Sequence, residues 1–290
     1  MKIAIAKAYN GVHKRINQHL KNLGVTTVYF DIDQPDWWQT IKKINPTVNG
    51  YFWNADDKGK YYYQINDRVY LLEQLTNKPV FPGTKQYFFY NDKISQLNFL
   101  KFHDLPYPKT FVTTSHDKAL NFIKKAKYPF VLKDAHSASA MGVFLIKNQK
   151  QAKQAIEGIF SAKGFNSIFG YFYAQEFIAN LDRDLRIITV GDKVAAAYWR
   201  INKKDWRHNV GLGGEVDNKN VPAEAKKLVK KISKIGKFDW MAYDLLILPN
   251  NKILILEFSC NFGVKGAKKF NIDIRKIQAN YIYNYLKNKK

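Results

Sequence analysis

The sequence predicts an α/β protein in which a small parallel-sheet domain precedes a larger α+β region of hairpins and helices. Residues 1–88 alternate short apolar runs with segments of helical period, the pattern of consecutive βα units. Residues 238–257 indicate a hairpin instead, because two apolar runs flank the turn Pro249-Asn250-Asn251-Lys252. The sequence has no uncharged apolar run of about 18 residues, so no membrane span is predicted.

The first predicted domain covers residues 1–88. Apolar residues at helical spacing, such as Val12, Ile16 and Leu20, predict helices between its strands, and Gly24 follows the first of these helices. The expected strands are Lys2–Ala6, Val25–Phe30, Val48–Trp53 and Val80-Phe81, with helices from Val12, after Pro35 and around 67–75. The domain contains no G-x-G-x-x-G turn, so a dinucleotide site is not indicated.

The second predicted domain covers residues 89–290, after a linker at Phe81-Pro82-Gly83. Its expected elements are, in order, a helix capped by Asp92, a strand at 110–114, a helix capped near Asp117, strands at 129–133 and 143–146, a helix at 149–160, strands at 171–178, 185–190 and 193–199, a loop at 201–221, a helix at 222–236, the hairpin, and a basic helix from Asp273.

The composition favours a cytoplasmic protein. The N-terminal apolar run is too short for a signal peptide, and the single cysteine, Cys260, excludes internal disulfides. The net charge of +23 favours anionic partners, and taken alone it allows nucleic-acid binding. However, lysines are scattered through every segment in a chain rich in Asn, Tyr and Ile, which is typical of codon bias.

Arginine is scarce, and its distribution is more informative than the total charge. Only seven residues are arginine, and four of them lie between 183 and 207. Arginine suits planar, bidentate contact with carboxylates and phosphates. This segment is therefore expected to bind anions.

The hairpin carries two carboxylates, Asp244 and Glu257, on opposite arms. A carboxylate in an apolar strand is costly unless it is paired or bound to a metal, and Mg²⁺ takes oxygen ligands. The alternative is that both side chains are solvated at the strand ends.

Other polar residues lie where strands end or pair. Lys133 ends an apolar strand and precedes DAHSASAMGV, whose small residues would let backbone N–H groups approach a phosphate. Asp184 and Arg186 are two residues apart on one strand face, where they can form a salt bridge or a site. Arg200 ends the next strand, and Arg207 precedes a glycine-rich loop, which favours anion binding.

The order of these segments resembles the ATP-grasp superfamily and, within it, the RimK-like carboxylate-amine ligases. The resemblance rests on DKISQLNFLKFHDLPYPKTF, PFVLK with its small-residue loop, AQEFI, DLRIITVGDKVAAAYWR, WRHNVGLGG and YDLLI...ILEFSCNFGVKG. It implies an ATP-grasp fold over 89–290, preceded by the usual small α/β domain. The nucleotide-covering subdomain would span about 110–175 and the C-terminal subdomain about 176–290. The sequence of the small-residue loop after PFVLK is more similar to that of ATP-grasp proteins from surface-polysaccharide gene sets than to that of peptide ligases.

The resemblance implies ATP and Mg²⁺ as cofactors, with roles for particular residues. Arg200, Arg207 and Arg186 would be the catalytic arginines. Asp184 would orient Arg186 or approach the ribose. The nucleotide would contact Lys93, Lys133, Ser137, Ser139, Gly142, Gln175, Glu176, Phe177, Ile178 and Asp184. Asp244 and Glu257 would bind Mg²⁺. The third ligand is open, because Ser259 stands where the family has asparagine and Asn261 follows two residues later.

The implied reaction joins a carboxylate to an amine through an acyl phosphate, with release of ADP and phosphate. The partners would be a sugar, peptide or amino-acid carboxylate and an amine, with no nucleic acid and no membrane; a homo-oligomer is compatible with the sequence. Two rival interpretations remain: an ATP-binding regulator without catalysis, suggested by Ser259, and a basic nucleic-acid-binding protein, suggested by charge alone.

Overall fold

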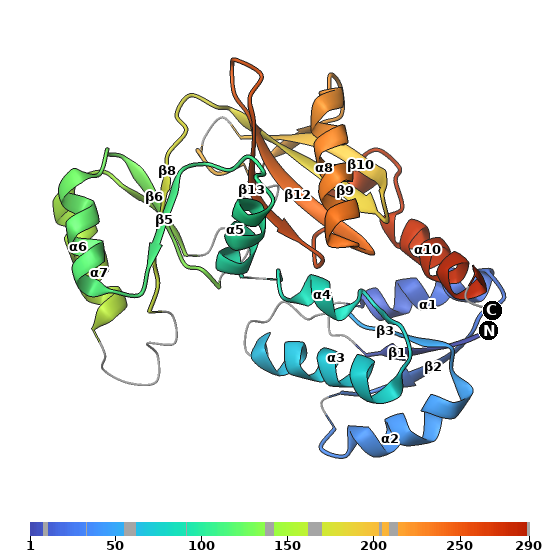
Figure 1. Cartoon of the computed structure of the whole chain (residues 1–290). Coiled ribbons are helices and arrows are strands. Elements are labelled where there is room, and N and C mark those ends of the chain that lie inside the picture. Colours follow the sequence, from blue (N-terminus) through green and yellow to red (C-terminus); the bar gives the residue numbers. More distant parts are fainter. Residues whose placement is uncertain are drawn as a thin grey trace.

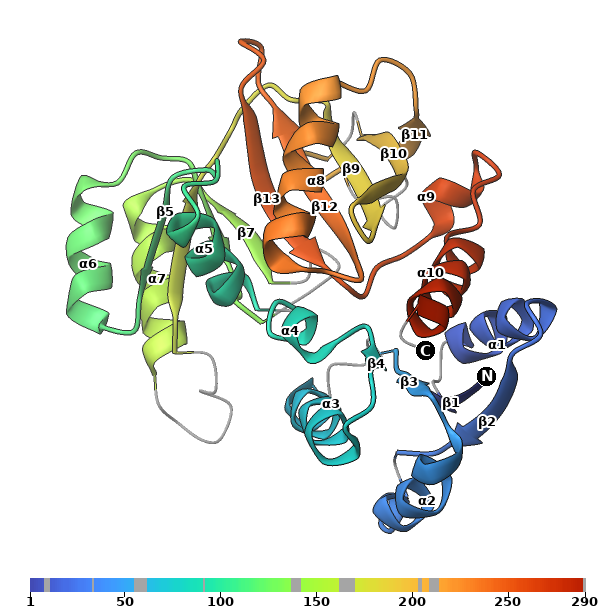
Figure 2. The same cartoon turned by 45° about the vertical axis from the view of Figure 1, so that its right-hand side comes forward.

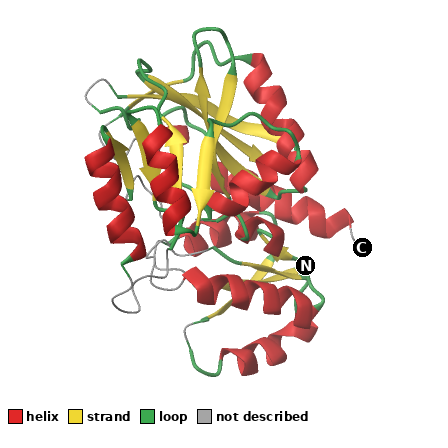
Figure 3. Ribbon diagram, turned by 60° about the vertical axis from the view of Figure 1, so that its left-hand side comes forward, coloured by secondary structure: helices red, strands yellow, loops and turns green. Residues whose placement is uncertain are grey.

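In the structure, a computed structural model of the 290-residue chain, the described residues form three sheets (Figure 1). It describes residues 1–7, 11–32, 34–54, 62–90, 92–136, 142–161, 170–202, 205–208 and 214–288, with 62–67 described by their backbone alone. The strand-rich second part of the chain lies above the N-terminal sheet in Figure 3. Among the described residues, no helix is long and apolar enough to cross a membrane.

The N-terminal part is a four-stranded sheet whose strands all pair in parallel, as the sequence predicts. Its strand order is β2-β1-β3-β4. Helix α1 buries Val12, Ile16 and Leu20, the apolar face predicted from their spacing. The elements are β1 (Lys2–Ala6), α1 (Val12–Asn22), β2 (Thr26–Phe30), α2 (Trp37–Ile44), the 3₁₀ turn η1 (Asn45–Thr47), β3 (Gly50–Phe52), α3 (Tyr62–Thr76) and β4 (Val80–Phe81).

The second sheet is antiparallel, in the order β5-β8-β6-β7. One face packs against α6 and α7, where Leu132 and Phe172 share a hydrophobic cluster with Ile123 and Ile156. Because side chains alternate along a strand, Lys133 points to the opposite face. The elements are α4 (Thr84–Tyr87), α5 (Lys93–Phe102), β5 (Thr110–Thr113), α6 (His116–Lys125), β6 (Phe130–Lys133), β7 (Val143–Ile146), α7 (Gln149–Phe160) and β8 (Phe172–Glu176).

The third sheet is also antiparallel, in the order β11-β10-β9-β12-β13, and α8 covers one of its faces (Figure 2). Under α8, the hydroxyls of Thr189, Ser233 and Tyr243 form a buried chain with two 2.8 Å hydrogen bonds. The elements are β9 (Arg183–Val190), β10 (Lys193–Ile201), β11 (Glu215–Asp217), α8 (Ala223–Gly236), β12 (Trp240–Ile247), β13 (Ile253–Ser259), α9 (Lys265–Lys268) and α10 (Ile274–Asn288).

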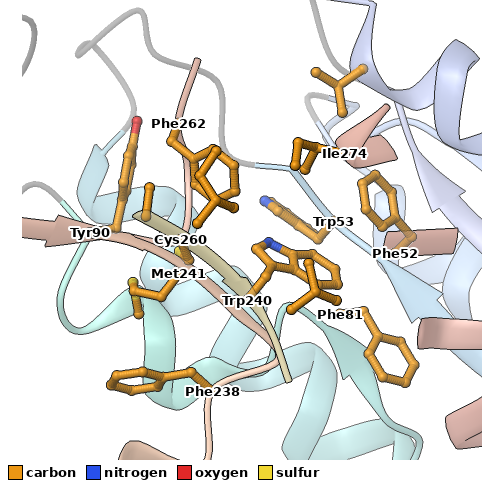
Figure 4. Close-up of a cluster of buried hydrophobic side chains, with 14 of the residues drawn as sticks. Phe52, Trp53, Phe81, Tyr90, Phe238, Trp240, Met241, Cys260, Phe262 and Ile274 are labelled. Atoms are coloured by element: carbon orange, nitrogen blue, oxygen red, sulfur yellow. The ribbon is translucent and has the colours of Figure 1, made fainter. Parts of the chain in front are cut away.

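One hydrophobic cluster joins the first and third sheets. Phe52 and Trp53 at the end of β3 lie beside Trp240, Phe262 and Ile274 from the C-terminal part (Figure 4). Helix α10 packs against α1 and so returns the chain to the N-terminal domain (Figure 2). The second sheet has a separate cluster of its own.

The sequence pattern misses four short elements and misplaces one cap. Strand β11 lies within the segment 201–221 that was expected to be a loop, and η1, α4 and α9 were not predicted; elements of three or four residues are too short to show a period. The N-cap of α6 is Ser115, whose Oγ accepts a hydrogen bond from the Lys118 N–H, so the prediction of a cap near Asp117 was wrong by two residues.

Gly236 ends α8 against the ring of Phe238, and we predict that Gly236→Ala destabilises the protein. The added methyl group would lie 2.2 Å from Phe238 Cζ and 2.4 Å from Cε1. Overpacking of this kind costs about 1–3 kcal/mol, more than the roughly 0.5–1 kcal/mol that alanine gains over glycine in a helix. The measurement is the free energy of unfolding in urea.

Gly158 in α7 is the matched control, because a methyl group there would have no atom within 4 Å. Gly158→Ala should raise the free energy of unfolding by about 0.5–1 kcal/mol. Equal changes in the two variants would contradict the packing argument.

Candidate functional site

The charged residues predicted between 184 and 257 lie on one face of the third sheet. Strand pairing sets Arg200 opposite Asp184, Arg186 opposite Asp244, and Asp244 opposite Glu257. The intervening residues of β9 and β12, such as Leu185 and Ile187, face the other way and are buried in the hydrophobic cluster. The alternation of the strands therefore gathers the charges on the face away from α8.

Four of these charges form one ion-pair network, here called the Asp184–Arg186 network, made of Asp184, Arg200, Asp244 and Arg186. Arg200 donates from Nε to Asp184 Oδ1 at 2.6 Å and from Nη2 to Oδ2 at 2.5 Å. Arg186 donates to both oxygens of Asp244 at 2.7 Å, and Arg200 Nη2 lies 2.9 Å from Asp244 Oδ2. Of the alternatives left open for Asp184 and Arg186, a salt bridge between the two is not formed, because each pairs with a residue of a neighbouring strand.

The network keeps Asp244 ionised although only 4% of the surface of this residue is exposed. Burial alone would raise the pKa of this carboxyl group, but Arg186 and Arg200 outweigh burial and hold the pKa well below its usual range. Asp244 is thus an anion at neutral pH with oxygen lone pairs directed at two guanidinium groups.

Two lysines lie on the facing wall. Lys133 ends β6, and Lys93 begins α5. The backbone N–H of Lys93 donates to the carbonyl of Ala135, just beyond β6. Both lysines are buried. Burial, opposed by Glu257 and reinforced by Lys93, lowers the pKa of Lys133 to about 8. Burial also lowers the pKa of Lys93. Two desolvated ammonium groups side by side favour a ligand that carries several negative charges.

The two sheets enclose a cleft that is lined from both of its walls. Its lining combines the charged groups above with apolar side chains and with the segment that connects β8 to β9. The described lining residues are Lys93, Val131, Lys133, Val143, Gln175, Glu176, Phe177, Ile178, Asn180, Leu181, Asp184, Arg200, Trp206, Arg207, His208, Asp244, Leu246, Leu256 and Glu257.

The connection between the sheets is anchored at both ends. Glu176 Oε1 accepts a hydrogen bond from the Lys109 N–H at 2.7 Å, and its own N–H donates to the Lys109 carbonyl. His208 Nε2 lies 3.1 Å from the Leu181 carbonyl oxygen. The side chain and the backbone N–H of Glu176 are therefore both engaged with Lys109.

Not every predicted site residue lines the cleft. Arg186 lies behind Asp244 in the network. Gly142 has a φ of +70°, and its carbonyl accepts a hydrogen bond from the Asp134 N–H at 2.7 Å. Ser259 donates from Oγ to the Asn261 carbonyl at 2.8 Å, and the Asn261 side-chain amide donates to Tyr90 Oη at 3.3 Å. Ser137 and Ser139 lie outside the described residues.

The sequence argument missed the apolar floor of the cleft. Leu246 follows Asp244 by two residues, so strand alternation could have placed it on the same face. Leu256 adjoins Glu257 and would ordinarily face the other side. Asp244 pairs with Glu257 and Leu245 pairs with Ile255, so Leu256 is an extra residue, a β-bulge, in β13. The bulge breaks the alternation of the side chains, and both Leu256 and Glu257 reach the cleft. Trp206, edge-on to Phe177 at 5.7 Å, was also missed.

The donor set fits Mg²⁺ bound together with an anionic ligand. No group of three or more His, Cys, Asp or Glu residues suited to a metal occurs in the described part of the chain. Asp244 and Glu257 supply two hard oxygen donors, and a substrate phosphate can complete the shell. Among the described lining residues, four cations and four carboxylates balance one another: Lys93, Lys133, Arg200 and Arg207 against Glu176, Asp184, Asp244 and Glu257. A triphosphate would upset this balance unless a divalent cation accompanied it.

The class of protein follows from two sheets enclosing such a cleft. The chain has the fold of ATP-grasp enzymes: it superimposes on D-alanine–D-alanine ligase from Bacillus anthracis complexed with ATP with a TM-score of 0.70. The match covers 99% of this chain and 97% of that one at 12% identity, which shows the fold alone. The RimK-like ATP-grasp domain matches residues 90–282, more than half of the chain. The protein belongs to this family.

Two curated relatives bear on the kind of ligase. An alpha-aminoadipate–LysW ligase of Sulfurisphaera tokodaii is 27% identical over 186 residues, which are 63% of this chain and 62% of that enzyme. A coenzyme gamma-F420-2:alpha-L-glutamate ligase of Methanocaldococcus jannaschii is 28% identical over 203 residues, which are 68% and 67% of the two chains. The chain thus spans less than two thirds of the first relative.

We predict that Asp184→Asn strongly destabilises the fold, because it leaves the buried Arg200 without its bidentate partner. Removing one member of a buried ion pair costs about 3–5 kcal/mol. The side chains of Asp184 and Arg200 are 5% and 3% exposed. The measurement is the free energy of unfolding in urea at pH 7.

Asp205→Asn is the control, since it breaks a bidentate pair with Arg207, at 2.7 Å, in which the side chains are 28% and 34% exposed. A partly solvated pair contributes about 0–1 kcal/mol. A loss of similar size in both variants would show that burial of the network does not govern its energy.

Proposed function

We propose that the protein is an ATP- and Mg²⁺-dependent ligase that joins a carboxylate to an amine, with an amino dicarboxylic acid such as glutamate as one substrate. The observation that carries the proposal is the convergence of Lys93, Lys133, Arg200, Asp244 and Glu257 on one cleft. The names of the relatives, which are ligases of aminoadipate and glutamate, support the substrate class.

In the proposed reaction, a carboxylate oxygen of the acid substrate forms a bond to the γ-phosphorus while the bond from that phosphorus to the ADP oxygen breaks. The amine then attacks the acyl carbon of the resulting acyl phosphate. Phosphate leaves with the bonding electrons, and the amine loses a proton. ADP, phosphate and the amide are the products.

The protein contributes position and charge to both steps. Lys93 and Lys133 would hold the phosphates, and Arg200 and Arg207 would face the transferring group and the tetrahedral intermediate. Asp244 and Glu257 would hold Mg²⁺, which neutralises phosphate charge when bound. Arg186 takes a positioning role in this proposal, because it orients Asp244. The backbone of 176–178 would meet the adenine ring.

We predict that Glu257→Gln lowers kcat for ADP release on the order of a hundredfold or more, because the substitution removes a charged metal ligand. ADP is measured with L-glutamate and a panel of carboxylate substrates. Glu215→Gln on exposed β11 is the control and should keep wild-type turnover. Full turnover by Glu257→Gln would exclude the metal role, and a wild type that binds ATP without releasing ADP would favour the regulator.

We predict that the affinity for Mg-AMPPNP falls as the pH rises through about 8, the pKa of Lys133. The protonated lysine attracts phosphate and the neutral amine does not, so the affinity should decrease up to about tenfold for each further pH unit. Titration calorimetry from pH 6.5 to 9.5 measures the Kd. Lys133→Arg, which stays charged throughout, should show a smaller decrease, because Lys93 alone of the two lysines then titrates. Identical pH profiles for the two proteins would contradict the assignment.

A further inference from the structure

His208 is a buried imidazole in the wall of the cleft. Only 6% of the residue is exposed, and it lines the cleft together with Arg207, Arg200 and Asp184. The second step of the proposed reaction releases a proton from the amine. A side chain that takes this proton must line the cleft and carry a free lone pair. The contacts of His208 show that it has one.

The hydrogen bond to Leu181 fixes which ring nitrogen of His208 carries the proton. His208 Nε2 lies 3.1 Å from the Leu181 carbonyl oxygen. A carbonyl oxygen can only accept, so Nε2 is the donor. In the neutral ring, Nδ1 then holds the lone pair. Nδ1 has no hydrogen bond to any described residue and is not sealed inside the protein, so the ring presents an oriented base.

A carboxylate lies on the Nδ1 side of the ring. Asp184 Oδ2 is 4.0 Å from His208 Nδ1, too far for a hydrogen bond but close enough for strong Coulomb attraction in a buried site. Asp184 would therefore attract the imidazolium that forms when Nδ1 takes a proton. The ionisable groups around the ring are Asp184 on β9, Asp182 just before β9, Arg200 on β10, and Asp205 and Arg207 on its own loop.

The carboxylates of the cleft already have other partners or roles. Asp184 and Asp244 each accept two hydrogen bonds from an arginine, and Glu176 Oε1 accepts a backbone N–H. Glu257 is the proposed metal ligand. The lysines act in the proposal as phosphate-binding cations. Among the described lining residues, His208 is thus the base without another task.

The loop that carries His208 is held against the connection between the sheets. The Asn202 N–H donates to the Asp182 carbonyl at 3.1 Å, and Asn202 Nδ2 donates to the Arg207 carbonyl at 3.1 Å. With the contact between His208 and Leu181, these bonds fix both ends of the described segment 205–208. His208 is therefore held beside Arg207, which would face the tetrahedral intermediate.

We propose that His208 is the general base of amide formation, a role that rests on the proposed function. As the amine nitrogen of L-glutamate forms its bond to the acyl carbon, an N–H bond breaks and the proton passes to the lone pair of Nδ1. The bond between the acyl carbon and the phosphate oxygen then breaks, and phosphate leaves with the bonding electrons. The imidazolium, held between the Leu181 carbonyl and Asp184, returns its proton to water after the products leave.

The experiment compares wild type with His208→Gln, using L-glutamate or hydroxylamine as the nucleophile and a carboxylate that supports ADP release by wild type. Glutamine keeps a donor for the Leu181 carbonyl but has no basic nitrogen. Because general bases contribute about 10²–10⁴-fold, kcat/KM for L-glutamate should fall on the order of a hundredfold or more. Hydroxylamine is unprotonated at neutral pH and needs no base, so hydroxamate formation should be nearly unchanged.

The pH dependence gives a second readout. An imidazolium cannot accept a proton, so the rate of amide formation by wild type relative to His208→Gln should decrease as the pH falls below neutrality. Taking this ratio cancels the protonation of L-glutamate itself. His116→Gln is the matched control, because its side chain is 39% exposed on α6, outside the cleft lining, and it should behave like wild type with both nucleophiles.

Three outcomes would overturn the inference. Equal amide formation by wild type and His208→Gln would show that another group takes the proton. Parallel losses of amide and hydroxamate would show that His208 only supports the structure of the site. No ADP release by wild type with any carboxylate would overturn the proposed function itself, and the role of His208 with it; the first two outcomes leave the proposed function standing.

Discussion

The architecture of the site depends on the buried Asp184–Arg186 network across three neighbouring strands. Each of its carboxylates lies against a guanidinium group, and Arg200 contacts both Asp184 and Asp244. Four charges can be buried here only because all four are present. The network holds the Asp244 carboxylate in place. Glu257, on the edge strand β13 of the same hairpin, forms no bidentate pair with an arginine. The charge that a ligand meets in the cleft is thus set by groups that the protein has already oriented.

The two walls of the cleft belong to different hydrophobic clusters, and this limits what can change when a ligand binds. The wall with the network is continuous with the N-terminal domain through the cluster around Trp240, while the wall with Lys133 is built on the separate cluster of α6 and α7. Movement of the second wall would change the width of the cleft without disturbing the network. Such movement would also alter the burial of Lys133, and its lowered pKa results mainly from that burial.

The sequence predicted the ingredients of the site better than their partners. Charged residues in apolar strands identified Asp244 and Glu257, and spacing placed Asp184 and Arg186 on one face. The pairing of Asp184 with Arg200, however, depends on the strand order β10-β9-β12 and on its register, which no local pattern specifies. The bulge that turns Leu256 toward the cleft is likewise a property of two paired strands. The parallel N-terminal sheet was predictable because its signals, short apolar runs and helical periods, are local.

Burial, and not the total charge, distinguishes the cations with specific roles. Arg200 and Arg275 are similarly buried, at 2% and 5% exposure, yet Arg200 has two carboxylates around it and Arg275 has an amide. The first arrangement is complete without a ligand. The second leaves the Arg275 Nε donor buried without a hydrogen-bond partner, which costs stability. An excess of +23 spread over exposed lysines would attract many anions weakly, whereas the Arg200 guanidinium, oriented by two carboxylates, presents its charge at one fixed position in the cleft.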